Sequence, residues 1–363
     1  MFGISRVVCV LGAALLAACS ASSQPAAGGG SSVGTLSACQ QSFSPERVAA
    51  GENCTPVAET YCSNDGSAGS LLDPQVRACD GVQIDDVEIT VGNMSSHYLA
   101  IRPSGRSSFD TIYLGLHYLI GNVVAFANIA RLSELAKARG VLVLLPQAPS
   151  ADGSNLTSVW PTTALNAALL PSYVGFLDGV VADGRSRYGA SGAKLYVSGL
   201  SNGASMAYLY GCLASQPVRA VQAVAGDLGE SSIDECQLSR PLGTVIVHGT
   251  ADAENPYGGI TGIKPAIPDV HAKFKTNNNC SGEDSSVALP LTSDALQVTI
   301  YYTASCDQGR RDFLVKVDNG GHVWPGGNVN EADLPSLSLF GLHTANFDAT
   351  LQGFDLLRLA GGG

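Results

Sequence analysis

Short apolar runs alternate along this chain with longer segments in which apolar residues recur every three or four positions. The short runs predict β-strands and the longer segments predict helices, because each spacing places apolar side chains on the buried face of that element. The predicted strands are residues 87–91, 98–101, 111–116, 141–145, 194–197, 220–225, 244–247, 296–302 and 313–317. The predicted helices are residues 123–138, 164–188, 204–213 and 347–359.

This alternation predicts an α/β protein. Most of the runs contain few polar residues, which is typical of a mostly parallel sheet covered by helices on both faces. In such sheets the ligand site lies beyond the carboxyl ends of the strands. Ser201, Asp252 and His322 each follow a predicted strand closely. We therefore expect these three side chains to meet at one edge of the sheet.

Ser201 lies in the segment Gly199-Leu200-Ser201-Asn202-Gly203, between a predicted strand and a predicted helix. A serine on such a tight turn needs small neighbours, and glycines two residues before and after it relieve the crowding. The pattern alone is weak, because the segment 30–34 also matches it within a Ser/Gly-rich stretch. Only Ser201 has the strand and helix context, which predicts a nucleophilic serine.

A serine hydroxyl needs a base to remove its proton, and a histidine oriented by a carboxylate supplies that function. The order Ser201, Asp252, His322 is the order of nucleophile, acid and base in α/β-hydrolases. Two other residues, Asp227 and Glu254, compete for the role of the acid. We favour Asp252, because it follows the strand 244–247 and fits the chain order.

Backbone N–H groups that stabilise an oxyanion are expected near the serine. One belongs to Asn202, and the second is expected from Tyr118 or Leu119, in the loop after the strand 111–116. The two tryptophans of the chain, Trp160 and Trp324, lie in loops next to prolines. We expect both indole rings to line the substrate site.

The N-terminus has the features of an export signal. Arg6 precedes the apolar stretch 7–18, which is too short to cross a bilayer. The segment ends in Leu-Ala-Ala-Cys at Cys19, which resembles the lipobox of bacterial lipoproteins and implies acylation of this cysteine. An ordinary signal peptide with a chance cysteine is the alternative. Residues 20–37 are rich in Ser, Gly and Ala and predict a flexible linker.

Apart from Cys9 and Cys19, the chain has an even number of cysteines, as expected of disulfides in an exported protein. Proximity suggests that the first four pair among themselves and that the last four form two local pairs. A zinc site is a weaker alternative, because no Cys-x-x-Cys or Cys/His ligand spacing occurs, so we expect no metal. These cysteines are Cys39, Cys54, Cys62, Cys79, Cys212, Cys236, Cys280 and Cys306.

The chain thus divides into a signal peptide (1–19), a linker (20–37), a disulfide-rich extension (38–82) and a catalytic domain (83–363). Its 363 residues suffice for a large core, and 45% hydrophobic with 14% charged residues is typical of a globular protein. The formal net charge of −11 argues against nucleic acid as a partner, because phosphates require clustered Lys and Arg.

Three segments resemble the esterase/polyhydroxybutyrate depolymerase family, which includes feruloyl and acetylxylan esterases. They are residues 195–207 (LYVSGLSNGASMA), 248–252 (HGTAD) and 321–327 (GHVWPGG). The resemblance implies an α/β-hydrolase fold and ester hydrolysis without a cofactor by Ser201, Asp252 and His322. The chain departs from the family at His117-Tyr118, where the family usually has His-Gly.

Together with the export signal and the cysteines, the resemblance predicts an esterase outside the cytoplasm, either secreted or anchored to a bacterial membrane through Cys19. Its expected substrate is a polyester of the polyhydroxyalkanoate type or an oligomer of it. A carbohydrate esterase that releases feruloyl or acetyl groups is the alternative within the family. From another class, the chain could be a surface-binding lipoprotein without catalytic activity, although the complete set of Ser201, Asp252 and His322 argues against this.

Overall fold

The computed structural model describes residues 36–57, 69–70, 73–150, 158–229, 236, 240–291, 294–303, 306–328 and 340–363. The predicted export signal with Cys19, the linker up to residue 35, and Cys62 lie outside the described residues. The described residues belong to one compact unit.

A ten-stranded sheet forms the centre of this unit, in the order β10-β11-β12-β9-β8-β7-β5-β6-β4-β3. The strands from β12 to β6 in this order run parallel, and antiparallel strands flank them at both edges. The bounds are β3 Val82–Val91, β4 Met94–Pro103, β5 Thr111–Leu116, β6 Leu142–Pro146, β7 Lys194–Leu200, β8 Val218–Val224, β9 Gly243–Gly249, β10 Ser285–Ala288, β11 Val298–Tyr302 and β12 Asp312–Val317. Gly69–Ser70 (β1) and Asp73–Pro74 (β2) form a separate two-stranded ladder.

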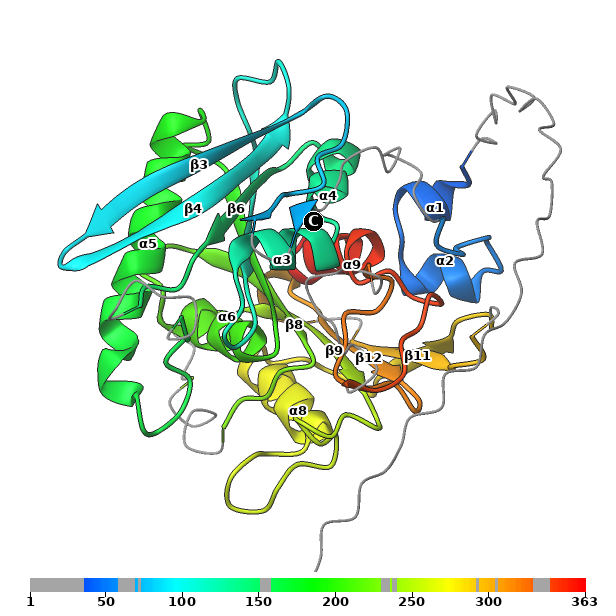
Figure 1. The fold of residues 1–363 in the computed structure, drawn as a ribbon. Helices are drawn as coiled ribbons and strands as arrows, with labels where there is room; N and C mark the ends of the chain where they lie inside the picture. The colour runs from blue at the N-terminus through cyan, green and yellow to red at the C-terminus, as the bar shows by residue number, and fades with distance from the viewer. Residues whose placement is uncertain are drawn as a thin grey trace, which may run out of the picture. The chain divides into compact units, whose positions relative to one another are not determined.

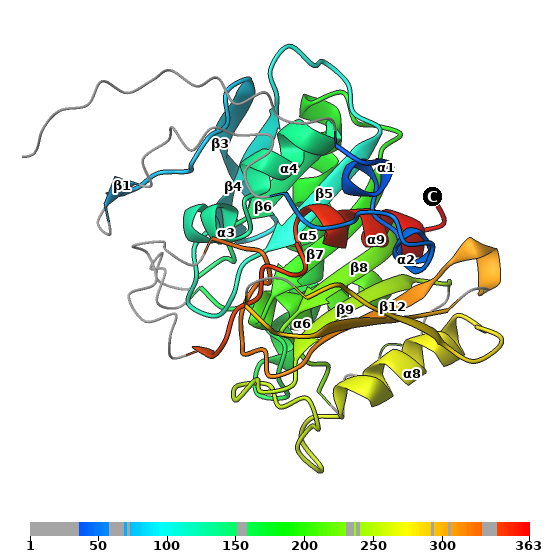
Figure 2. The same ribbon diagram turned by 90° about the vertical axis from the view of Figure 1, so that its right-hand side faces the viewer.

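Helices cover both faces of the sheet. Side chains of α3 (Val123–Ile129), α4 (Leu132–Arg139) and α9 (Leu351–Ala360) pack in one core, and those of α5 (Leu170–Arg187), α6 (Asn202–Leu213) and α8 (Ile267–Asn277) pack in the other. Figure 2 shows α9 and α8 on opposite sides of β8, β9 and β12, and Figure 1 shows the long β3–β4 hairpin at one edge.

Successive side chains of a strand enter opposite cores, as the pleat requires. In β5, Tyr113 packs with α9 through Phe354, whereas Ile112 and Leu114 belong to the core under α5 and α6. All three side chains are fully buried. This explains the apolar runs of the sequence, because a strand buried on both faces favours apolar side chains at successive positions.

The structure corrects several predicted elements. The helix predicted over 123–138 is interrupted at Arg131, which has a φ of 46° and separates α3 from α4. The helix predicted over 164–188 begins at Leu170, after a 3₁₀ turn, and the helix predicted from 347 begins at Leu351. Four further elements were not predicted: α8, β10 and the short helices α1 (Ala38–Gln41) and α2 (Pro45–Ala49).

The described part of the cysteine-rich extension packs against α9. A disulfide joins Cys39 to Cys54, and both sulfurs lie in the same core as α9. The Phe43 N–H donates to Asp355 Oδ2 at 2.9 Å, and Gln352 Nε2 donates to the Cys54 carbonyl at 2.8 Å. The extension therefore covers a helix of the main domain and shares its core.

Two further disulfides are local pairs, Cys212–Cys236 and Cys280–Cys306, as the sequence predicts. Cys79 is also disulfide-bonded. Disulfides of this kind are typical of proteins outside the cytoplasm. Within the described part of the chain, the helices lack the length and apolar character required to span a bilayer.

Candidate active site

Ser201 lies on the sharp turn between β7 and α6. Its φ of 57° and ψ of −120° are unusual for a residue with a side chain, and its N–H donates to the Val224 carbonyl at 2.9 Å. A Cβ at Gly199 would lie 2.2 Å from the Gly203 carbonyl oxygen, and one at Gly203 would lie 2.1 Å from the Leu116 carbonyl oxygen. Both glycines are therefore required for the turn that exposes the serine.

Three side chains from distant parts of the chain meet at this turn. His322 Nε2 lies 2.8 Å from Ser201 Oγ, and His322 Nδ1 lies 2.8 Å from Asp252 Oδ2. An ionised carboxylate only accepts hydrogen bonds, so Nδ1 carries the proton and Nε2 accepts from the serine hydroxyl. The arrangement can transfer a proton from Ser201 to His322.

Asp252 is buried, with 4% of its surface exposed. Its Oδ1 accepts hydrogen bonds from the N–H groups of Glu254 and Asn255, at 2.9 and 2.8 Å. His248 Nε2 lies 3.3 Å from Oδ2. Burial alone would raise the pKa of Asp252, but the hydrogen bonds from His248 and His322 outweigh it and lower the pKa well below its usual value. Asp252 is therefore a carboxylate that stays ionised.

The two competing acids lie elsewhere in the site. Asp227 forms an ion pair with Lys264 at 2.8 Å and accepts a hydrogen bond from Ser205 Oγ at 3.2 Å. Glu254 lines the pocket, and its backbone N–H supports Asp252. The carboxylate that contacts His322 is therefore that of Asp252.

The predicted oxyanion donors also lie at the site. Asn202 is the first residue of α6, where the backbone N–H groups have no partner within the helix. Tyr118 and Leu119 are in the loop after β5, and both line the pocket. His117 is fully buried, and this burial lowers its pKa to about 4, so its ring is neutral and structural.

A pocket of about 480 Å³ opens beside Ser201. Trp160 and Trp324 both belong to its wall, although they are only 0% and 2% exposed. Each indole N–H is used within the protein, by the His117 carbonyl at 2.9 Å and by Thr350 Oγ1 at 3.0 Å. The two tryptophans can therefore offer the pocket only their ring surfaces.

Most of the pocket wall consists of residues that were not predicted from the sequence. The polar end of the pocket, formed by Asp227, Glu254, Asn255 and Lys264, follows β8 and β9, and placement after strands was the signal that could have found it. Most of the apolar wall has no such signal, because its residues come from a strand end, a helix end and loops that are distant in sequence. Its other members include Ile129, Val159, Leu200, Val323 and Phe340.

Several exposed apolar residues lie close in sequence to residues that line the pocket. Large apolar residues at the surface are individually common, but a group beside a pocket is informative. Leu165, which is 99% exposed, directly precedes the pocket residue Asn166, and Ile263, which is 62% exposed, directly precedes the pocket residue Lys264. We call this group the apolar rim, and it comprises Leu119, Ile120, Leu165, Leu169, Ile260, Ile263 and Leu342.

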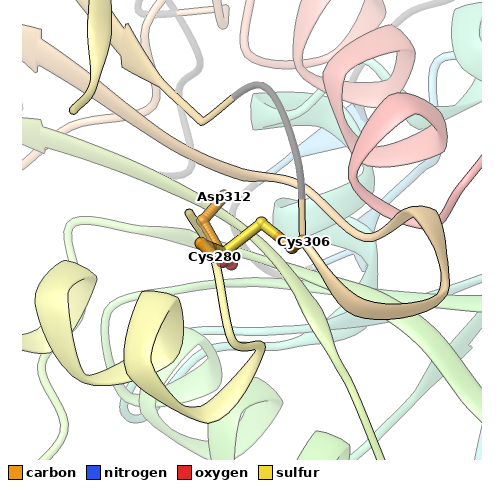
Figure 3. A group of neighbouring side chains, drawn as sticks. All are labelled: Cys280, Cys306 and Asp312. Carbon is orange, nitrogen blue, oxygen red and sulfur yellow. Dashed lines mark hydrogen bonds between the residues drawn. A yellow bond between two sulfur atoms is a disulfide. The ribbon is translucent and has the colours of Figure 1, made fainter. Parts of the chain in front are cut away.

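A cluster with metal-ligand residue types lies away from this site. Cys280, Cys306 and Asp312 are close neighbours, as Figure 3 shows. The two sulfurs are bonded to each other, so neither is a thiolate that could bind a cation. The Asp312 carboxyl accepts hydrogen bonds from Thr244 and Asn278 instead. The cluster is a structural junction and not a metal centre.

No protein-family model and no curated protein sequence matches this chain. Solved structures resemble its fold at low identity. An acetyl xylan esterase from Aspergillus awamori is 15% identical with a TM-score of 0.46, covering 66% of this chain and 94% of that one. A dienelactone hydrolase from Anabaena variabilis is 16% identical with a TM-score of 0.40, covering 55% and 81%. With its mostly parallel sheet between helices, the chain has the α/β-hydrolase fold that the sequence predicts.

Proposed function

We propose that this chain is a serine esterase in which Ser201, His322 and Asp252 act as nucleophile, base and acid. The observation that carries the proposal is the unbroken set of 2.8 Å contacts from Asp252 through His322 to Ser201. These contacts lie beside a pocket large enough for a small ester.

In the proposed reaction, Ser201 Oγ attacks the ester carbonyl while His322 Nε2 accepts the hydroxyl proton. The ester C–O bond then breaks, and His322 returns this proton to the leaving alcohol. Water then attacks the acyl carbonyl while His322 Nε2 accepts one of its protons. The bond between the acyl group and Ser201 Oγ breaks, the acid leaves, and His322 returns the proton to Ser201. Asp252 keeps the imidazole in the required tautomer and stabilises its positive charge during both steps.

The charge that develops on the carbonyl oxygen needs two donors. Asn202 at the start of α6 supplies one N–H, and the loop of Tyr118 and Leu119 supplies the other. The helix dipole of α6 adds a favourable positive potential at the same point. No metal or cofactor has a role in this sequence of steps.

The preferred substrate in this proposal is a polyester of the hydroxyalkanoate type or an oligomer of it. The apolar rim supports this choice, because a water-insoluble chain offers apolar surface beyond the ester that lies in the pocket. A carbohydrate esterase is the second candidate. The polar end of the pocket, with Asp227, Glu254 and Lys264, favours it because sugar hydroxyls are hydrogen-bond donors and acceptors.

A substrate panel tests the choice. The purified protein is incubated with polyhydroxybutyrate film, with methyl ferulate and with acetylated xylan, and the released acids are quantified. We expect release of hydroxybutyrate monomers or oligomers from the film. Activity on the ferulate or the xylan alone would replace the first candidate with the second.

Labelling by a fluorophosphonate probe tests the catalytic centre itself, and Ser201→Ala is the control. We expect stoichiometric labelling of the wild type and none of the variant. An intact wild-type protein that does not react would instead support a non-catalytic binding protein.

The proposal includes export and, through Cys19, a lipid anchor. The disulfides support a location outside the cytoplasm. Expression of the full chain in a bacterial host, followed by membrane fractionation and mass spectrometry of the N-terminal peptide, tests the anchor. A Cys19→Ser variant that remains in the membrane fraction would contradict it.

A further inference from the structure

The side chain and backbone of Trp160 connect the two parts of the candidate oxyanion hole. The Trp160 N–H donates to Asn202 Oδ1 at 2.9 Å, and Asn202 Nδ2 donates back to the Trp160 carbonyl at 3.1 Å. Asn202 Nδ2 also donates to Thr162 Oγ1 at 2.8 Å. The residue that follows the nucleophile is therefore tied to the segment of Trp160 by reciprocal hydrogen bonds.

The indole ring of Trp160 holds the opposite loop. Its Nε1–H donates to the His117 carbonyl at 2.9 Å, and the His117 and Trp160 rings are 5.3 Å apart. In a planar trans peptide the N–H points away from the carbonyl oxygen of the preceding residue. The bond to the His117 carbonyl thus fixes the plane of the peptide that carries the Tyr118 N–H.

The next peptide is fixed through His117. His117 Nδ1 donates to the Tyr118 carbonyl at 2.8 Å, and the Gly121 N–H donates to the same oxygen at 3.0 Å. The other ring nitrogen, Nε2, accepts from the Ala148 N–H at 3.0 Å. These bonds set the plane of the peptide that carries the Leu119 N–H. Because the ring is neutral and fully buried, it forms these bonds in a single tautomer.

We infer that Trp160 is a positioning residue, which sets the separation and direction of the two oxyanion donors through one buried side chain. The inference rests on the proposed esterase function. In this inference the indole N–H holds the loop after β5, which is a role separate from the contact between the ring face and the substrate.

The variant Trp160→Phe tests the inference, because it keeps an aromatic ring and removes the indole N–H. With p-nitrophenyl butyrate, we expect kcat to fall about tenfold or more and KM to change less than about twofold, since only the transition state carries the oxyanion. The affinity for phenylboronic acid, which forms a tetrahedral adduct with the serine, should fall in proportion to kcat.

Tyr173→Phe is the matched control. Tyr173 packs on the other side of Trp160, with ring centroids 6.2 Å apart, and its hydroxyl donates to the Pro149 carbonyl at 2.7 Å. The control variant therefore loses a buried hydrogen bond next to the same indole without touching the loop of His117. We expect its kcat and boronate affinity to match the wild type.

Asn202→Ala provides a second test if Trp160→Phe does not fold. It keeps the Asn202 backbone N–H but breaks both bonds to Trp160, and we expect the same fall in kcat with little change in KM. A variant with wild-type kcat, or one in which only KM rises, would overturn the inference. A wild-type protein that hydrolyses no ester would overturn the proposed function instead, so the two failures are distinct.

Discussion

Asp252 illustrates how single residues of this site are held from several directions. Two backbone amides bind one carboxylate oxygen, and two imidazoles lie at the other. These partners keep the pKa of the carboxyl well below its usual value despite burial. The carboxylate that orients His322 is therefore ionised at neutral pH.

Replacement of this carboxylate tests its role. In Asp252→Asn the side chain keeps its shape but loses its charge and can present an N–H to the imidazole, which favours the wrong tautomer. We expect kcat for p-nitrophenyl butyrate to fall about 10³- to 10⁴-fold. Asp227→Asn is the control, because it makes the same chemical change at the competing carboxylate. A large loss in Asp227→Asn with a small loss in Asp252→Asn would reverse the assignment.

At the scale of elements, Asp312 joins several parts of the fold. It begins β12, and its carboxyl accepts hydrogen bonds from Thr244 on β9 and from Asn278 at the end of α8. The disulfide Cys280–Cys306 lies against it. Burial of the carboxyl raises its pKa to about 6, although the hydrogen bonds from Thr244 and Asn278 lower it.

This raised pKa predicts a pH dependence of stability. Between about pH 4 and pH 6 the folded state keeps a proton on Asp312 that the unfolded state releases, so the free energy of unfolding decreases as pH rises through this window. Across this window, the free energy of unfolding should decrease by a total on the order of 3 kcal/mol because of Asp312. Urea titrations of the wild type and of Asp312→Asn should show a difference in stability that changes over this window. A constant difference from pH 4 to pH 7 would contradict the prediction.

The sequence predicted the parallel strands well, because a strand buried on both faces leaves a clear apolar run, as at Thr111–Leu116. The interruption of the helix at Arg131 was not predictable from periodicity, since apolar spacing continues across it. The helix α8 was missed although Pro268 marks its start and Ile267, Val270 and Phe274 have helical spacing. The many polar residues of α8 made the helical spacing of its apolar residues hard to recognise.

At the scale of the whole molecule, the order of three strands assembles the site. Ser201, Asp252 and His322 follow β7, β9 and β12, whose carboxyl ends point to one edge of the sheet. This part of the site was predictable, because it depends on topology alone. The pocket wall was not, because residues such as Ile129 and Phe340 reach it through tertiary packing.

Disulfides cross-link several segments of this fold, and their reduction tests how far stability depends on them. Cys212–Cys236 and Cys280–Cys306 close loops with sequence separations of 24 and 26 residues. Such cross-links contribute about 2–4 kcal/mol each, mainly by restricting the unfolded chain. We expect a lower melting temperature after reduction with dithiothreitol, measured by circular dichroism. An unchanged melting temperature, with reduction verified by mass spectrometry, would refute this.

The apolar rim predicts different behaviour toward solid and soluble esters. Leu165 and Ile263 are the chain neighbours of the pocket residues Asn166 and Lys264, in two separate segments, and both expose most of their surface. Burial of each such side chain against a polymer contributes about 1.5–3 kcal/mol. In the double variant Leu165→Ser/Ile263→Ser we therefore expect the hydrolysis of polyhydroxybutyrate film to fall at least tenfold. With p-nitrophenyl butyrate, kcat/KM should stay within about twofold of the wild type.

Leu213→Ser is the matched control for this rim, because Leu213 is 43% exposed at the far end of α6 from Ser201. Loss of one exposed leucine there removes apolar surface without changing the loops around the pocket, so film hydrolysis should equal that of the wild type. Adsorption to the film, measured by depletion of protein from solution, should fall only in the rim variant. Equal adsorption by all three proteins would show that the rim does not contact the polymer, and the polar end of the pocket would then favour a soluble carbohydrate ester.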